Sequence, residues 1–405
     1  MEKRIDLRGL VGLFAYTCCA SANNITSGIL AYMMKTYAEV SSTTVAMVMT
    51  CPAIVGTIFA FAAGTLINRF GAKKMTMFIH AMLFVSGMIY LFLGNKTSVY
   101  VLWLASCFVG FLMGAGTVCI SQLLTYTVAD PTKRGAIYGY ATAVQSLGGV
   151  FFASVGGAIA ARGGGVHWER AYLLYFIIPV FIAVEFFCLP EKPRITGFSE
   201  TVNLNKNNEK DDKKERVPFI IWVIAVHYSF FFLCLYTFSL NLSEYVITTH
   251  SLGTSVESGL AISIMTVGGI ISGLTFGFYS KLLKKYTVPV LMGFTVLGLA
   301  MLVFIPNLYV LYVASVILGF SMMGCGPYVI TELARYTTPK TYPKATSLYA
   351  GFMNVGMMVA VYVLATLAGF FFKDSTSVTG KFTIALVGSV LVCVSSFPIY
   401  ARKRK

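Results

Sequence analysis

Several side chains that can bind a solute or carry a proton stand inside long apolar stretches of this sequence. His227 falls about nine residues into one such stretch, at a depth of roughly 14 Å if the stretch is a helix. An imidazole there could carry a proton near physiological pH, or could stay neutral and hydrogen-bond to a neighbouring helix. Glu244, near the far end of the same stretch, is the second candidate for a cation or a proton.

Uncharged polar and aromatic side chains in these stretches are candidates for contacting a small solute. Polar groups are costly in an apolar layer and tend to face the interior of a helix bundle. Such amides can also simply bond one helix to another, and aromatic stripes can simply pack, so both interpretations stay open. The candidates are Tyr16, Asn23, Asn24, Ser27, Gln122, Gln145, His227, Phe231, Asn241, Tyr245 and Asn354.

Catalytic and metal-binding patterns are missing from the sequence. None of the nine cysteines has C-x-x-C spacing, which argues against zinc or redox chemistry. The H-E-x-x-H, G-x-S-x-G and phosphate-loop signatures are also missing. We therefore expect no enzyme, no cofactor and no metal.

The elements that must position the candidate residues are membrane-spanning helices. Hydrophobic residues make up 57% of the 405 residues and charged residues only 12%, against about 25% in a soluble domain. A helix needs about 20 apolar residues to cross a hydrocarbon layer of about 30 Å. Twelve stretches meet this requirement: 9–34, 42–67, 74–94, 98–127, 135–161, 170–189, 218–247, 255–280, 286–305, 308–336, 344–371 and 382–401.

The positions of lysine and arginine predict the orientation of these helices. With both termini in the cytoplasm, all but six of the 31 basic residues fall on the cytoplasmic side. The net charge of +15 then reflects inner loops beside anionic lipid, and we expect no nucleic-acid partner. We expect a multi-pass protein of a bacterial inner (plasma) membrane. The six outer basic residues are Lys35, Lys96, Arg162, Arg170, Lys373 and Lys381.

A polar segment divides the chain into two halves. Residues 190–217 carry many charges of both signs and cannot bury apolar area, so we expect a cytoplasmic linker or surface helix. The linker separates an N-terminal six-helix bundle, residues 1–189, from a C-terminal six-helix bundle with a basic tail, residues 218–405.

The two halves are weakly similar in sequence. A shift of 210 residues places Gly114 over Gly324, and a shift of 213 residues places Gly56 over Gly269. Chance matches between apolar stretches are the alternative explanation. We interpret the matches as parallel repeats of six spans related by an axis along the membrane normal.

The loop between the second and third spans carries a recognisable motif. It resembles the G-x-L-x-D-R-x-G-R-[RK] loop of the major facilitator superfamily, whose members are transporters. The resemblance implies an all-α membrane fold of 12 transmembrane helices in two six-helix pseudo-symmetric halves. The loop reads Gly64-Thr-Leu-Ile-Asn68-Arg69-Phe-Gly71-Ala-Lys73-Lys74.

The resemblance implies roles for the motif and for three residues elsewhere in a cytoplasmic gate. Gly64 allows close approach of a neighbouring helix, and Gly71 suits a tight turn. The family's acidic position, which helps to latch the two halves, is Asn68 here; an asparagine accepts hydrogen bonds but brings no charge. Further expected gate residues are Arg69, Lys73, Lys74, Arg134, Glu332 and Arg335.

The resemblance also implies a function. In this fold the first, fourth, seventh and tenth spans line a central cavity, and the chain would move a small organic solute by alternating access, with H⁺ as a candidate coupling ion and a monomer as the family's usual state. The first span is weakly similar to the oxalate/formate–monocarboxylate branch, which makes a small carboxylate the alternative substrate, by uniport or exchange. A membrane sensor or scaffold that has lost transport is a further alternative.

Overall fold

The computed structural model describes residues 5–40, 42–162, 165–192, 217–253, 255–338 and 340–400. Most of the predicted linker and the basic tail at 401–405 lie outside the described residues.

All six spans predicted in the first half are helical, and their ends agree with the prediction to within a few residues. The first is built from α1 (Leu7–Ala20), η1 (Ser21–Asn24) and α2 (Ile25–Thr36). The others are α3 (Ser42–Phe70), α4 (Ala72–Leu93), α5 (Val99–Cys107) with α6 (Val109–Thr127), α7 (Pro131–Ala161), and η2 (Trp168–Ile177) with α8 (Ile178–Cys188).

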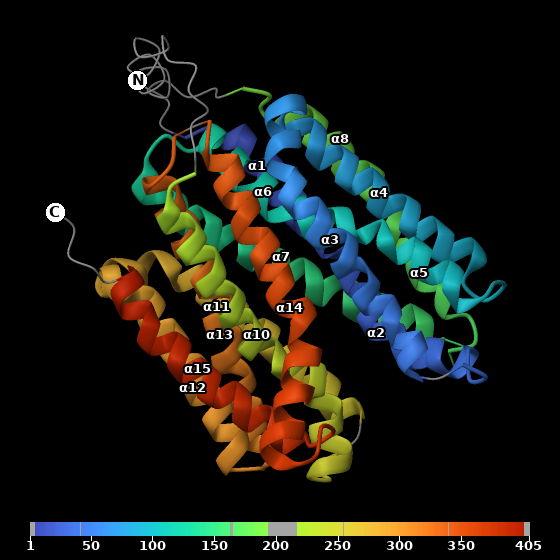
Figure 1. Ribbon diagram of the computed structural model, residues 1–405. Helices are drawn as coiled ribbons and strands as arrows, with labels where there is room; N and C mark the ends of the chain where they lie inside the picture. The colour runs from blue at the N-terminus through green and yellow to red at the C-terminus, as the bar shows by residue number, and fades with distance from the viewer. Residues whose placement is uncertain are drawn as a thin grey trace, which may run out of the picture. The chain divides into compact units, whose positions relative to one another are not determined.

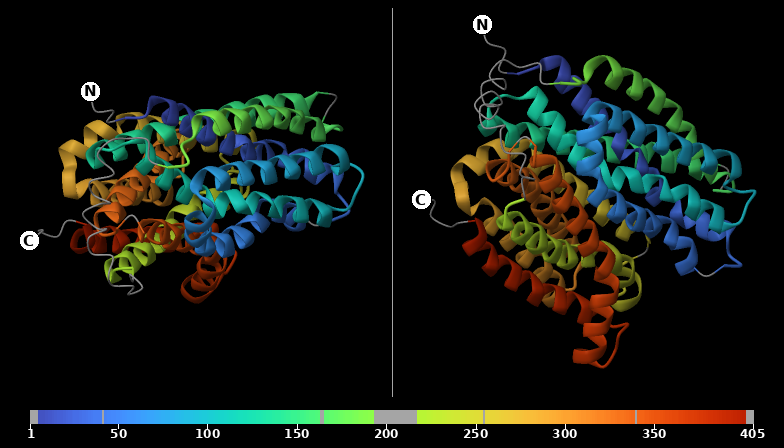
Figure 2. Two further views of the ribbon diagram at one scale, coloured as in Figure 1. Left: turned by 90° about the horizontal axis from the view of Figure 1, so that it is seen from above. Right: turned by 45° about the horizontal axis from the view of Figure 1, so that its top comes forward.

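The six spans predicted in the second half are helical as well. They are α10 (Phe219–Glu244) with η3 (Tyr245–Thr249), α11 (Ser255–Leu283), η4 (Lys284–Tyr286) with α12 (Thr287–Phe304), α13 (Leu308–Arg335), α14 (Tyr342–Phe372) and α15 (Val378–Tyr400). Within this half α12 and α15 run side by side, as Figures 1 and 2 show.

Length and hydropathy support membrane crossing by these helices. Within the described ranges nine helices are long and apolar enough to cross a membrane, and ten if the bent pair Tyr342–Ala360 and Tyr362–Phe372 is one span. One of the nine, Glu257–Phe304, has 48 residues, which is the length of two spans, and it contains most of α11 and all of α12. The first span is divided into pieces that are each too short for such a test. The twelve-helix fold class predicted above is therefore confirmed.

The first span is interrupted by a turn of tighter helix. The four residues of η1 form a 3-10 helix between α1 and α2, and they include Asn23 and Asn24. A 3-10 helix has about three residues per turn, so the faces of α1 and α2 do not follow one α-helical register. The candidate amides of this span thus sit at a break in the helix.

The chain forms two compact units. Unit 1 contains residues 1–218 and 333–351, and unit 2 contains residues 219–332 and 352–405. The end of α13 and the beginning of α14, which belong to the second half of the sequence, thus pack with unit 1. The domain division at residues 189 and 218 stays a prediction.

Each unit contains a helix crossing in which a glycine lets two backbones meet. In unit 1, α3 and α6 have the most extensive contact, and a Cβ on Gly114 of α6 would lie 2.5 Å from the carbonyl oxygen of Gly56 in α3. In unit 2, a Cβ on Gly319 of α13 would overlap the carbonyl oxygen of Met265 in α11. The crossings join spans two and four and spans eight and ten, which is the correspondence expected of a six-span repeat.

Candidate functional site

The predicted gate motif lies at the end of α3 and the beginning of α4, where α14 approaches it within unit 1. The Gly64 backbone N–H donates to Ser347 Oγ at 3.2 Å, and the Ser347 hydroxyl donates to the Ala60 carbonyl oxygen. A Cβ on Gly64 would lie 2.5 Å from the Pro343 carbonyl oxygen. Glycine at position 64 therefore permits the close approach of α3 and α14 that the motif predicted.

The turn between α3 and α4 depends on Gly71. Its φ of 86° and ψ of 149° fall in a region of backbone conformation that only glycine adopts readily. Beyond this turn, Lys73 Nζ lies 5.0 Å from the centre of the Phe186 ring and 4.0 Å from Glu191 Oε1. The lysine thereby holds the start of α4 against α8. Asn68, Arg69 and Lys74 are exposed.

Substitution of Gly71 by alanine is expected to lower the free energy of unfolding by about 1–3 kcal/mol, because a Cβ is strained in this conformation. Thermal unfolding of the purified protein in detergent measures the effect. Gly157→Ala is the matched control: Gly157 is inside α7 and a Cβ there meets nothing within 4 Å. We expect the control to leave stability unchanged or to raise it, by up to about 1 kcal/mol. Equal stability of the two variants would contradict the prediction.

The other predicted gate residues lie near helix ends. The Arg134 guanidinium, in the first turns of α7, donates from Nε to the Val128 carbonyl oxygen at 2.8 Å and from Nη2 to the Ala129 carbonyl oxygen at 3.2 Å. Arg134 thus fixes the end of the preceding helix, α6. Glu332 is buried in unit 2, whereas Arg335 is exposed at the end of α13 and belongs to unit 1.

The solute candidates of unit 1 differ in their surroundings. Gln122 on α6 is buried, and its Oε1 has no hydrogen-bond partner among the described residues. Gln145 on α7 is half-buried, and its backbone carbonyl oxygen accepts from the Ser21 hydroxyl at 2.5 Å. Asn23 is half-buried, and Asn24 is exposed with its amide against Gly149 of α7. The side chain of Ser27 lies outside the described part of the chain.

Tyr16, the remaining candidate of unit 1, is wholly buried. Its ring lies against the imidazole of His80, with 4.7 Å between ring centres. Its hydroxyl is buried and has no hydrogen-bond partner among the described residues.

The solute candidates of unit 2 are buried. Asn241 Nδ2 donates to the Thr237 carbonyl oxygen at 3.0 Å, one turn earlier on α10. The Tyr245 hydroxyl donates to the Leu302 carbonyl oxygen of α12 at 2.7 Å. Phe231 and Asn354 are buried, on α10 and α14. Contacts with neighbouring helices account for the burial of Tyr245, and the part that each residue plays in binding stays a prediction.

The two predicted coupling residues occupy different environments. His227 Nε2 lies 2.9 Å from the Val392 carbonyl oxygen of α15, so this nitrogen carries a hydrogen and donates it. The imidazole also packs edge-to-face on Tyr400, with 5.6 Å between ring centres. Glu244 is exposed at the end of α10. His227 thus serves at least to join α10 to α15.

The structure reveals a buried acid–base pair that the sequence analysis did not identify. His80 Nδ1 on α4 lies 2.6 Å from Glu185 Oε1 on α8, and both side chains are completely buried. His80 stands eight residues after the start of α4, about 12 Å along the helix. The sequence does contain one signal for this site, which is a histidine at such a depth in an apolar stretch. Its partner could not be recognised because 105 residues separate the two.

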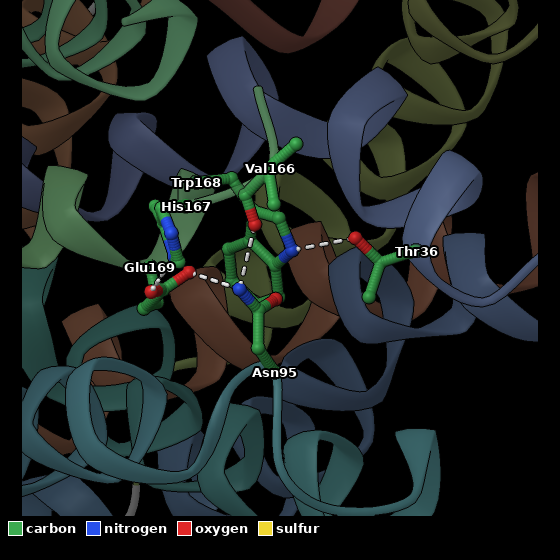
Figure 3. Close-up of polar contacts among 6 residues, drawn as sticks. All are labelled: Thr36, Asn95, Val166, His167, Trp168 and Glu169. Atoms are coloured by element: carbon green, nitrogen blue, oxygen red, sulfur yellow. Dashed lines mark hydrogen bonds and ion pairs between the residues drawn. The ribbon is translucent and has the colours of Figure 1, made fainter. Parts of the chain in front are cut away.

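A second polar cluster lies at the end of unit 1 that is remote from the gate motif, where the α4–α5 turn meets the segment before η2 (Figure 3). Asn95 Nδ2 donates to the Val166 carbonyl oxygen at 2.8 Å and to Glu169 Oε2 at 2.5 Å. His167 Nδ1 lies 3.2 Å from Glu169 Oε1, and the Trp168 indole N–H donates to Thr36 Oγ1 at 3.0 Å. This cluster ties α2, α4 and η2 together.

Comparison with known proteins identifies the family and the fold. The sequence profile of the major facilitator superfamily matches residues 12–359 and 245–405. A sequence search of curated proteins finds no match. The fold is similar to that of the proton:xylose symporter XylE bound to 6-bromo-6-deoxy-D-glucose, with a TM-score of 0.74, 14% identity, and coverage of 96% of this chain and 94% of that one.

Two further solved structures share the fold. The human organic anion transporter MFSD10 (TETRAN) has a TM-score of 0.72 and 13% identity, with 96% of this chain and 99% of that chain covered. The Escherichia coli fucose:proton symporter FucP has a TM-score of 0.69 and 12% identity, with 97% and 99% covered. Because the profile spans nearly the whole sequence, this chain belongs to the major facilitator superfamily, a family of membrane transporters.

Proposed function

We propose that this transporter moves a small organic solute that is neutral or weakly charged. The observation that carries the proposal is the uncharged character of the candidate polar groups. Gln122 presents a buried carbonyl oxygen without a hydrogen-bond partner among the described residues, and Asn23 and Gln145 of the same unit are half-buried amides. Amides donate and accept hydrogen bonds without charge, which suits hydroxyl or carbonyl groups of a neutral solute.

The distribution of basic residues supports the same proposal. No lysine or arginine lies at the middle of a predicted span, so a buried guanidinium or ammonium is not available to hold an anion. XylE and FucP, which share the fold, are described as symporters of sugars with protons. We propose alternating access by rocking of the two six-helix bundles, acting as a monomer, with a proton as the candidate coupling ion.

A small carboxylate is the alternative substrate. MFSD10, which shares the fold, is described as an organic anion transporter, and the first span is weakly similar to the oxalate/formate–monocarboxylate branch. A carboxylate site would have to be built from amides, hydroxyls and helix ends.

Ligand-dependent thermal unfolding tests the substrate class. The purified protein would be heated in detergent with D-xylose, L-fucose, formate, oxalate and a panel of amphipathic cations, at two pH values. A ligand at about 100 times its dissociation constant stabilises the folded state by roughly 2.7 kcal/mol. We expect stabilisation by a neutral compound, and its loss in Gln122→Ala. The matched control is Asn307→Ala, which removes an exposed amide between α12 and α13.

The outcomes separate the alternatives. Stabilisation by formate or oxalate alone would replace the neutral solute by a small carboxylate. No stabilisation by any compound, together with no uptake of the same compounds into proteoliposomes, would favour a sensor or scaffold.

We also propose that both termini are cytoplasmic in a bacterial inner membrane, because the basic residues are strongly biased to that side. A fluorescent or alkaline-phosphatase reporter fused at position 210, outside the described residues, is expected to report a cytoplasmic location. The matched fusion at Asn95, between α4 and α5, is expected to report the opposite side. A periplasmic signal from position 210 would reverse the proposed orientation.

A further inference from the structure

We propose that His80, Glu185 and Tyr16 form a proton-binding site inside unit 1, built between α4, α8 and α1. The site is distinct from the amides proposed to contact the solute. The pair binds its proton whether or not a solute is present, so the inference goes beyond the proposed function. Only the step from proton binding to coupled transport rests on that function.

The charge of the pair favours a bound proton. When His80 is neutral and Glu185 is ionised, the pair carries one net negative charge inside a bundle of apolar helices. One added proton makes the pair neutral, either as imidazolium with carboxylate or as imidazole with carboxylic acid. Burial of a net charge is costly, whereas a neutral hydrogen-bonded pair avoids most of that cost. The geometry of the pair, with one hydrogen bond of 2.6 Å between two completely buried side chains, leaves room for one shared proton.

Unused hydrogen-bonding capacity surrounds the pair. His80 Nε2, Glu185 Oε2 and the Tyr16 hydroxyl are all buried, and each has no hydrogen-bond partner among the described residues. A purely structural pair normally satisfies such atoms, because unsatisfied buried polar groups are destabilising. Each of these three atoms, grouped around one short hydrogen bond, can accept a proton or a hydrogen bond.

The surroundings of the pair contain weak acids that stay neutral near physiological pH. The groups that interact electrostatically with Tyr16 or Glu185 are Cys19 on α1, Cys119 on α6 and Tyr138 on α7. Tyr175 of η2 interacts with Cys19. No lysine or arginine of the described residues interacts with the pair at salt-bridge distance. The bound proton is therefore assigned to His80 and Glu185.

Tyr16 connects the proton site to the break in the first span. Its ring packs on His80, and it lies on α1, which ends at Ala20 where η1 begins. The Ser21 hydroxyl in η1 contacts the Gln145 carbonyl oxygen, and Asn23 and Asn24 follow in the same turn. A change in the charge of the imidazole thus acts on the Tyr16 ring. The helix that carries Tyr16 is followed directly by the turn that carries the candidate solute contacts.

The direct test is a pH titration of the purified full-length protein by infrared difference spectroscopy, with the proton itself as the probe. Between about pH 5 and pH 8, wild-type protein is expected to show a reversible change in the carboxyl and imidazole bands. Isotope-labelled histidine assigns the imidazole bands. Glu185→Gln is expected to abolish the change. His80→Gln is expected to keep the carboxylic-acid band throughout this range, because an ionised Glu185 would then be a buried charge without a partner.

Two controls keep the test decisive. Glu191→Gln removes an exposed carboxylate, 68% exposed, and is expected to leave the buried signal intact. Tyr16→Phe keeps the ring and is expected to alter the pH-dependent change without abolishing it. This variant provides the test if Glu185→Gln fails to fold. Identical spectra of wild type and Glu185→Gln, or a wild-type signal that does not change with pH, would overturn the proposal. Because the spectroscopic titration needs no solute, its result does not depend on the outcome of a transport assay.

Discussion

Replacement of Glu185 by alanine is expected to lower the free energy of unfolding by about 3–5 kcal/mol, because it leaves His80 buried without its partner. Loss of the carboxylate exposes the imidazole Nδ1 to an apolar surrounding and opens a gap between α4 and α8. Denaturant unfolding in detergent, followed by circular dichroism, measures the change. His80→Ala is expected to cost a similar amount, since it leaves the carboxylate unpaired.

The double variant distinguishes a coupled pair from two independent core positions. If the residues stabilise unit 1 as a pair, the loss in His80→Ala/Glu185→Ala is smaller than the sum of the two single losses. The exposed Glu191, whose carboxylate lies 4.0 Å from Lys73, provides the matched control. Glu191→Ala is expected to change stability by no more than about 1 kcal/mol. Additive losses, or a control as damaging as Glu185→Ala, would show that the pair itself contributes little.

The helices could be predicted from the sequence because each is a local property of the chain. A run of about 20 apolar residues can satisfy its backbone groups in a membrane only as a helix. The ends also carry local signals: Gly71 with φ of 86° separates α3 from α4, and Pro131 opens α7. Gly64 and its motif predicted a close approach of helices, and α14 provides it.

The polar site of unit 1 could not be predicted in the same way, because it depends on how distant helices pack. Glu185 stands near the end of its predicted span, 170–189, where the sequence alone gives no sign of burial. Complete burial follows from the contacts of α8 with α1 and α4. Seven residues separate Tyr16 from Asn23, a spacing that would place the two side chains on one face of a continuous α-helix. The 3-10 turn of η1 interrupts that spacing, and the Tyr16 ring packs on His80.

Substitution of Gly319 by alanine is expected to be among the most damaging single changes in unit 2. A Cβ at this position would overlap the carbonyl oxygen of Met265, which belongs to the backbone of α11 and cannot move as a side chain can. Overpacking of a filled interior costs about 1–3 kcal/mol and more where backbone must shift. Thermal unfolding in detergent measures the loss. Gly259→Ala on α11 is the control, because a Cβ there meets nothing within 4 Å.

The corresponding change in unit 1 tests whether the two helix crossings depend on glycine in the same way. A Cβ on Gly114 would lie 2.5 Å from the Gly56 carbonyl oxygen and 2.8 Å from the Ala60 nitrogen, so Gly114→Ala also forces two backbones apart. Small residues let transmembrane helices approach closely, and helix contact in a membrane depends on such packing more than on the hydrophobic effect. If the halves are repeats, both variants should be destabilised while Gly259→Ala is not. If Gly319→Ala loses much stability and Gly114→Ala loses none, the α3–α6 crossing can move apart without cost. The two halves would then be similar in fold but not in helix packing.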